Sequence, residues 1–220
     1  MRNVRPRPAL SQSQEDYVKA LYQLGGSVGT TELSERMGVS APSAAQMLVR
    51  LCDLGLVSHD RYRAAALTPA GEAVALEMIR HHRLLEMYLA QALGYSWDEV
   101  HEEAERLEHV ISERMEQRIF DALGRPRLDP HGDPIPGPAG ELRPAPGRPL
   151  HECPAGVVLT VVRVSDRDPG VLREIARLGL VLGAKVEVLR VSRYEGPISI
   201  RVGNRRRQVA LGVARAVFLN

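Results

Sequence analysis

Histidines and carboxylates recur at helical spacing in the middle of the chain. In the segment DEVHEEAERLEHV, four side chains that can bind a cation follow at i, i+4, i+7 and i+8: His101, Glu105, Glu108 and His109. This spacing places them along one side of a helix. Carboxylates at the border of a buried face repel one another unless a cation offsets their charge. The pattern predicts a divalent-cation site, and a solvated acidic helix face is the alternative.

Two other segments supply further donors for such a site. His82 and Glu86 repeat the i, i+4 spacing on the preceding predicted helix, and Asp16 lies in the first predicted helix. Together with the later helix, they offer mostly hard oxygen donors and one or two imidazoles. That chemistry suits Mn²⁺ or Fe²⁺ and gives no advantage to metals that prefer thiolates.

A polar helix in the first third of the chain suits DNA. The segment TTELSERMGVSAPSAAQMLVRLCDLGLVSHDRYRAAALTPAGEAV has the order of a winged helix-turn-helix, with a turn at Gly38 and a basic wing over 56–68. Gln can pair with adenine in a major groove, and Ser can reach a phosphate or a base edge. The expected DNA contacts are Ser40, Pro42, Ser43, Gln46 and Arg50 on the second helix, and Arg61 and Arg63 in the wing. A small helical bundle with solvated polar faces is the alternative.

Hydrophobic periodicity predicts that helices position these groups. Apolar residues recur every three or four positions in five segments, at about 14–24, 32–37, 40–54, 69–93 and 98–123. The last segment carries an apolar stripe that we expect to form much of a dimer core: Val100, Ala104, Leu107, Ile111 and Met115.

The second half of the chain has a different character. Residues 124–150 hold eight prolines and five glycines, a density that disfavours long helices and central strands and predicts a linker. Beyond it, β-branched segments alternate with one helical pattern at 169–179. The strands are expected at 157–164, 185–191, 197–203 and within 207–219. The pattern predicts a small β-barrel with one short helix.

Composition narrows the class of protein. The 220 residues are 44% hydrophobic, enough for two or three compact units. Cys52 and Cys153 cannot build a disulfide framework, and no apolar run approaches the ~18 residues of a membrane helix, so we expect a cytoplasmic protein that binds no membrane. The charge is uneven: the net charge is +2 over 1–63, −7 over 64–124 and +7 over 125–220.

These segments together resemble the diphtheria-toxin-repressor family of iron- and manganese-dependent regulators. The resemblance covers nearly the whole chain, and its combination of RHHRLLE, HEEAERLEH and HGDPIP is specific, although each alone is weak. It implies a mainly α fold in four parts. These are a winged helix-turn-helix DNA-binding domain over 1–73, a helical metal-binding and dimerisation domain over 74–124, a Pro/Gly-rich linker over 125–150, and an SH3-like (FeoA-like) β-barrel over 151–220.

The resemblance also assigns roles to single residues. The primary, activating metal site is matched by Asp16, Glu105, Glu108 and His109. Asp16 and Glu105 stand where the iron-sensing branch has methionine and cysteine, which favours manganese. An ancillary or second manganese site is matched by His82, Glu86, His101, Asp129, His131 and, near the matching position, Asp168. Two positions depart: Lys19 replaces a glutamate ligand of the short manganese regulators, and Val171 replaces an amide ligand of the iron sensors.

The sequence therefore predicts a transcriptional repressor and not an enzyme. We expect a homodimer that binds palindromic operator DNA when loaded with Mn²⁺, or alternatively Fe²⁺, and that controls metal-homeostasis genes. A winged-helix regulator that senses a small organic ligand is the main alternative, and it predicts no effect of metal on DNA affinity. A metal-storage protein would bind metal without operator binding. A zinc hydrolase is disfavoured because Glu105 stands where its motif needs a second histidine.

Overall fold

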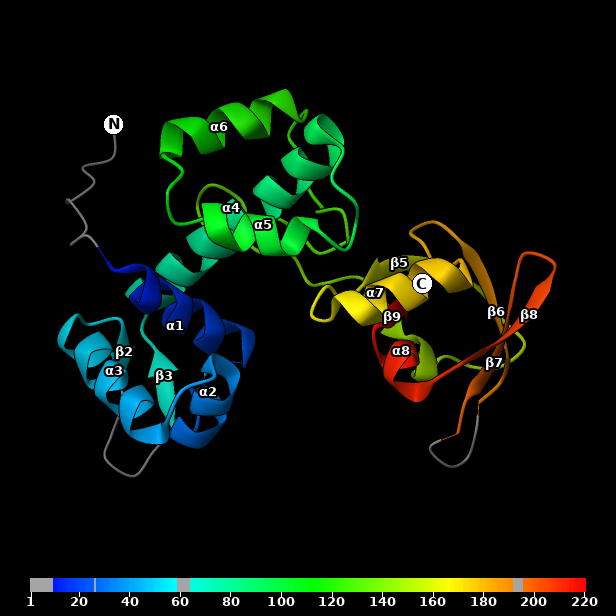
Figure 1. Ribbon diagram of the computed structural model, residues 1–220, viewed down its shortest axis with the longest axis horizontal. Coiled ribbons are helices and arrows are strands. Elements are labelled where there is room, and N and C mark those ends of the chain that lie inside the picture. Colours follow the sequence, from blue (N-terminus) through cyan, green and yellow to red (C-terminus); the bar gives the residue numbers. More distant parts are fainter. Residues whose placement is uncertain (1–9, 26, 59–63, 192–195) are drawn as a thin grey trace. The chain divides into compact units, whose positions relative to one another are not determined.

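The computed structural model describes residues 10–25, 27–58, 64–191 and 196–220 (Figure 1). The chain divides into two compact units. The first is Met1–His81 with Pro136–Glu141, and the second is His82–Ile135 with Leu142–Asn220. Helix α4, Pro69–Leu93, starts in the first unit and ends in the second, with the bounds that the sequence predicts.

The first unit has the order of a winged helix. Its helices are α1 (Gln12–Gln23), α2 (Thr30–Met37) and α3 (Ala41–Asp53), and its strands are β1 (Ser27–Val28), β2 (Val57–Ser58) and β3 (Ala65–Leu67), in sheet order β1-β3-β2. Gly38 ends α2 in the left-handed region at φ 65°, and the Ser40 side chain accepts from the backbone N–H of Ser43 to begin α3. The helices pack on Leu21, Leu33 and Leu48, which are fully buried. The predicted helix-turn-helix is therefore present.

The prediction of one continuous helix over 98–123 is wrong, because the chain forms two helices there. These are α5 (Val100–Leu107) and α6 (Glu113–Ala122). The break has a local cause, since the Ser112 side chain accepts a hydrogen bond from the Met115 N–H and starts a new helix. The predicted apolar stripe is split: Val100 and Ala104 are buried, whereas Met115 is 47% exposed.

The segment expected to be a linker contains an ordered loop. Leu128 and Pro134 form an isolated β-bridge, and His131 and Ile135 are buried. The loop lies against β5, because the Val164 N–H donates to the His131 carbonyl at 2.9 Å. Side-chain packing and backbone pairing thus hold a Pro/Gly-rich segment in one place.

The rest of the second unit is a six-stranded antiparallel sheet in the order β4-β9-β5-β6-β7-β8. Its strands are β4 (Arg148–Pro149), β5 (Val158–Val164), β6 (Lys185–Arg190), β7 (Ile198–Val202), β8 (Arg205–Val209) and β9 (Val217–Leu219). Alternating inward residues such as Val186, Val188 and Ile200 pack against α7, Pro169–Leu178. The sequence predicts one short helix in this region. The structure adds α8 (Leu211–Arg215), which divides the segment 207–219, and the 3-10 helix η1 (Leu150–Glu152).

Among the described residues, no helix has both the length and the apolar character to cross a membrane.

The approach of the loop to β5 requires glycine at position 132. Gly132 has φ 89°, and an added Cβ would overlap the Val162 carbonyl oxygen. Gly132→Ala should combine left-handed strain of about 1–2 kcal/mol with overpacking of about 1–3 kcal/mol. Gly156→Ala is the matched control, because Gly156 has φ 83° and open space around it. Denaturant unfolding should show a larger loss of free energy of unfolding in Gly132→Ala, and equal losses would contradict the close approach.

Candidate metal centre

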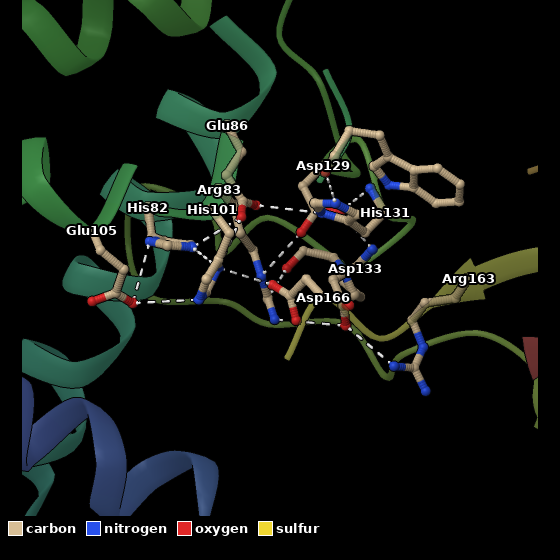
Figure 2. Close-up of polar contacts among 12 residues, drawn as sticks. His82, Arg83, Glu86, His101, Glu105, Asp129, His131, Asp133, Arg163 and Asp166 are labelled. Atoms are coloured by element: carbon tan, nitrogen blue, oxygen red, sulfur yellow. Dashed lines mark hydrogen bonds and ion pairs between the residues drawn. The ribbon is translucent and has the colours of Figure 1, made fainter. Parts of the chain in front are cut away.

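Glu86 lies at the centre of a group of histidines in the second unit. Its carboxylate, on α4, is fully buried. Its Oε1 lies 3.0 Å from His82 Nε2 and 3.3 Å from His101 Nδ1, and its Oε2 lies 3.8 Å from His131 Nδ1. Figure 2 shows that these side chains come from α4, from α5 and from the loop at 127–135 and point toward one another. One buried carboxylate thus faces three imidazoles.

Asp166 completes the first of two donor sets that include Glu86. His82, Glu86, His101 and Asp166, called here the His101 cluster, each offer one ligand atom, and these atoms lie within 4.8 Å of one another. Asp166 Oδ2 lies 3.4 Å from His101 Nδ1. Two imidazole nitrogens and two carboxylate oxygens form a donor set that suits Mn²⁺ or Fe²⁺.

The hydrogen bonds of His82 favour a cation at this cluster. His82 Nδ1 lies 2.7 Å from Glu108 Oε2, so Nδ1 carries the proton that this carboxylate accepts. In a neutral ring, Nε2 then turns a lone pair toward Glu86, and His101 Nδ1 also lies 3.0 Å from it. A lone pair that faces a carboxylate is repelled unless a proton or a metal ion lies between them. A metal-bound histidine whose second nitrogen donates to a carboxylate is a common arrangement in metal sites.

The second donor set is more deeply buried. Glu86, Asp129 and His131, called here the His131 cluster, also offer ligand atoms within 4.8 Å of one another. His131 Nε2 donates to the Trp97 carbonyl at 3.0 Å, which leaves a lone pair on Nδ1 in the neutral ring. Among the described residues, Glu86 Oε2 and His131 Nδ1 have no hydrogen-bond partner. Buried polar atoms are rarely left unsatisfied, so these two atoms fit a cation between them.

Asp129 also organises the loop that carries His131. Its Oδ1 accepts from the N–H groups of His131 at 2.8 Å and of Asp133 at 2.9 Å. Arg83 Nε lies 3.5 Å from Asp129 Oδ2, and Arg83 also pairs with Asp133 and donates to the Pro134 carbonyl. One carboxylate oxygen of Asp129 therefore accepts hydrogen bonds from the loop backbone, and the other contacts an arginine.

The residues predicted for the activating site lie in both units. Within the second unit, Glu108 is fully buried, with Oε1 3.5 Å from His109 Nε2, and Glu105 Oε1 lies 3.8 Å from His82 Nδ1. Asp16 lies half-buried on α1 in the first unit. Its part in the activating site stays a prediction.

The histidines and carboxylates shift each other's proton affinity. Burial lowers the pKa of His101, but hydrogen bonds and charge from Asp166 and Glu86 outweigh it and raise the pKa to about 10. Burial likewise opposes the effect of Glu86 and Asp129 on His131, whose pKa rises to about 9. Burial raises the pKa of Asp129 to about 7, and the neighbouring Glu86 charge adds to this shift. Burial also acts to raise the pKa of Glu86, but the histidines hold it well below its usual value.

The structure places Asp166, and not the predicted Asp168, in the His101 cluster. Asp168 is exposed, and its carboxylate caps α7 by accepting from the N–H groups of Gly170 and Val171. The sequence offers both aspartates, two positions apart, and only the fold shows which one faces His101.

The predicted DNA-contacting residues of α3 are all exposed: Ser40, Pro42, Ser43, Gln46 and Arg50. The hydroxyl groups of Ser40 and Ser43 lie 2.8 Å apart. Arg61 and Arg63, predicted for the wing, lie outside the described residues.

The position of Asp166 can be tested against Asp168. Asp166→Ala should weaken Mn²⁺ binding more than about tenfold, because it removes a donor from the His101 cluster. Asp168→Ala should leave Mn²⁺ affinity unchanged and cost about 1 kcal/mol of stability through the lost helix cap. Competition with a fluorescent chelator and thermal unfolding measure the two effects. A larger loss of Mn²⁺ affinity in Asp168→Ala would reverse the assignment.

Metal affinity should rise with pH. At neutral pH, His101 and His131 carry protons, because their pKa values are about 10 and about 9. A metal ion binds only the neutral imidazole, so each nitrogen that binds it must release its proton. Mn²⁺ affinity should increase about tenfold per pH unit for each proton released, between about pH 6.5 and 8.5. Calorimetry in buffers of different ionisation enthalpy measures the release, and His101→Gln should reduce it by one proton. Binding without proton release would sink this account.

Three domain families match consecutive parts of the chain. "Iron dependent repressor, N-terminal DNA binding domain" matches residues 9–65, and "Iron dependent repressor, metal binding and dimerisation domain" matches 68–137. "FeoA domain" matches residues 148–220. The three matches follow the order that the sequence predicts.

Curated relatives align with about half of the chain. The iron-dependent repressor IdeR of Mycobacterium tuberculosis is 36% identical over 106 residues, which cover 47% of this chain and 46% of the relative. The transcriptional regulator MntR of Salmonella typhimurium is 37% identical over 101 residues, which cover 44% of this chain and 64% of the relative. The chain thus spans about half the length of the first of these relatives.

Solved structures align over nearly the whole chain. A manganese-dependent transcriptional repressor in complex with manganese is 41% identical with a TM-score of 0.87, and the alignment covers 94% of this chain and 98% of that one. The manganese regulator SloR is 30% identical with a TM-score of 0.78, over 94% and 97% of the two chains. On these matches, together with the fold and the carboxylate–histidine centre, the chain belongs to the diphtheria-toxin-repressor family of iron- and manganese-dependent transcriptional repressors, a class of regulators and not of enzymes.

Proposed function

We propose that this chain represses transcription by binding operator DNA as a homodimer when Mn²⁺ fills its carboxylate–histidine centre. The observation that carries the proposal is the buried Glu86 carboxylate with imidazole nitrogens on both of its oxygens. Glu86 Oε2 and His131 Nδ1 lie 3.8 Å apart and have no hydrogen-bond partner among the described residues, so a cation that replaces the His131 proton would satisfy both atoms.

The donor atoms favour manganese among the family's metals. The His101 and His131 clusters offer carboxylate oxygens and imidazole nitrogens, and neither includes a cysteine. Hard oxygen donors suit Mn²⁺, and Fe²⁺ is the alternative because first-row ions share such ligands. The similar solved structure named as a complex with manganese supports this choice.

A bound cation would make the elements that hold it more rigid. When bound, it supplies two positive charges that replace protons on the histidines. Glu86 then ties α4 to His101 on α5 and to His131 on the loop, so these elements become one rigid group. By the family resemblance, Asp16 with Glu105 and Glu108 supplies the activating site. A coupling of about 1–3 kcal/mol between metal and DNA binding is typical of such a switch.

DNA recognition is proposed to use α3. A helix whose exposed face carries Ser40, Ser43 and Gln46 suits a major groove, and a dimer would place two such helices on a palindrome. Exposed apolar side chains between α5 and α6 and on α6 support a dimer interface there, since Val110 is 74% exposed and Met115 47%. A regulator of this kind would act on DNA in the cytoplasm, as the sequence predicts.

The test is operator binding with and without metal. A fragment from the upstream region of the gene should bind tightly only when Mn²⁺ is present, at fixed salt. Asp16→Ala and Glu105→Ala should lose this response, a drop of about 5–150-fold, while sedimentation shows an intact dimer. Glu102→Ala is the matched control, because Glu102 lies exposed on the same helix and pairs with Arg106.

Each contrary result has a clear meaning. Equal binding with and without Mn²⁺ would remove the metal switch and favour the regulator of a small organic ligand. Unchanged operator affinity of Glu105→Ala at saturating Mn²⁺ would remove that residue from the activating site.

A further inference from the structure

The outer face of strands β6, β7 and β8 gathers arginines in register. Arg190 lies opposite Ser199, which lies opposite Gln208, and Arg201 lies directly opposite Arg206. Cross-strand partners point to the same side of a sheet, and Ser199 and Arg201 are two positions apart, so both rows share one face. Strands β6, β7 and β8 are neighbours in Figure 1. This arginine face is defined by Arg190, Ser199, Arg201, Arg206 and Gln208.

The face is hollowed and carries an excess of positive charge among the residues that the structure describes. A hollow of about 510 Å³ is lined by Leu189, Arg190, Ser199, Arg206, Arg207 and Gln208. Arg201 pairs with Glu187 at 2.6 Å. Arg190 and Arg206 form no ion pair with any residue that the structure describes. Arg206 lies directly opposite Arg201, an arrangement of like charges that disfavours a sheet, and the one carboxylate of Glu187 pairs with Arg201 and not with Arg206.

Protection of a sheet edge does not account for the whole face. Strand β8 is an edge strand, and charged residues on an edge prevent pairing with other sheets. Arg190, however, lies on β6, two strands in from that edge, and it shares the hollow with Arg206. The charge therefore extends across three strands, which suits a ligand that covers several of them.

We infer that the arginine face binds the phosphate backbone of duplex DNA, in addition to the contacts of α3. The inference rests on the proposed function, which supplies the DNA. A guanidinium can form two parallel hydrogen bonds to a phosphate, and Ser and Gln side chains also donate to phosphates. Exposed single ion pairs are weak, whereas a polyanion engages several arginines at once and releases counterions.

The distribution of charge along the chain supports DNA as the ligand. Residues 1–63, which contain the winged helix, have a net charge of only +2, whereas residues 125–220 have +7. The electrostatic part of DNA binding does not depend on sequence and grows with the number of phosphates that are neutralised. Residues 151–220, the β domain, hold 12 Lys/Arg against 6 Asp/Glu, so this domain would contribute a large share of that attraction.

The test compares two charge reversals in the full-length, Mn²⁺-loaded protein. Arg206→Glu should weaken binding to a non-operator duplex and to the operator, about three- to tenfold per chain at low salt. It should also reduce the slope of log K against log salt by about 1 for each phosphate that the variant no longer neutralises. Arg215→Glu on α8 is the matched control, because it makes the same change of charge at an exposed position of the same domain. The control should leave the slope unchanged.

Thermal stability distinguishes weaker phosphate binding from a damaged fold. Arg206→Glu places a carboxylate opposite Arg201, so the unfolding midpoint should stay the same or rise while DNA affinity falls. A lower midpoint would assign the effect to folding, and Arg206→Gln, which keeps a polar side chain, then decides by its salt slope.

Three outcomes overturn the inference. A salt slope equal to that of the wild type in the Arg206 variants excludes a phosphate contact. An equal decrease of DNA affinity in Arg215→Glu assigns the effect to net charge. A change of oligomeric state in Arg206→Glu with unchanged DNA affinity assigns the face to an acidic surface of a second copy. If the wild type shows no response to Mn²⁺, the proposed function fails, whereas a normal Mn²⁺ response with an unaffected Arg206→Glu slope refutes this inference alone.

Discussion

The ionised carboxylate of Glu86, buried in the second unit, is the constraint around which the centre is built. A buried charge is costly unless it is paired and hydrogen-bonded, so the fold has to bring counter-charges to it. Histidines from three elements do this: His82 from α4 itself, His101 from α5 and His131 from the loop. Protons on His101 and His131 balance the charge without metal, and in the proposed metal-bound state a divalent cation would balance it instead. The same geometry would therefore serve both states, and the proposed metal binding would be an exchange of protons for a cation.

The loop at 127–135 extends this centre to the β domain. Asp133 lies between two arginines, with Arg83 at 3.6 Å on one side and Arg163 at 3.6 Å on the other. Arg83 is on α4, three residues before Glu86, and Arg163 is on β5, where its guanidinium stacks on the Phe218 ring. The ordering of His131 thus depends on ion pairs that join a helix to a strand. The Asp129 carboxylate accepts hydrogen bonds from two backbone N–H groups of the loop. Removal of that carboxylate would therefore disturb the conformation of the loop as well as the binding of any cation.

Sequence reasoning succeeded where a regular period connects the residues. Helical periodicity predicts helix α4 correctly. It also places His82 and Glu86 side by side, because residues four positions apart lie on the same face of a helix. It failed at Ser112, because the apolar period continues across a residue whose side chain starts a new helix. Asp129 and His131 have no periodic pattern in a Pro/Gly-rich segment, so only family resemblance identified them. Asp166 and Asp168 are the same residue type two positions apart, so the sequence alone does not tell their roles apart. The path of the chain after β5 places Asp166 in the His101 cluster and Asp168 at the cap of α7.

The uneven charge of the chain raises the question of how the metal acts on DNA binding. Residues 64–124 have a net charge of −7, which repels DNA, and each divalent cation bound there would reduce that repulsion. Salt limits this effect, because the Debye length is about 8 Å at physiological ionic strength and exposed charges beyond it are largely screened. Cations held by the proposed ligands Glu86 and His131, which are buried, would be screened less, but their influence there would be local. In the proposed switch, the metal would therefore act mainly by fixing the positions of α4, α5 and the loop, with neutralisation of charge as the smaller contribution.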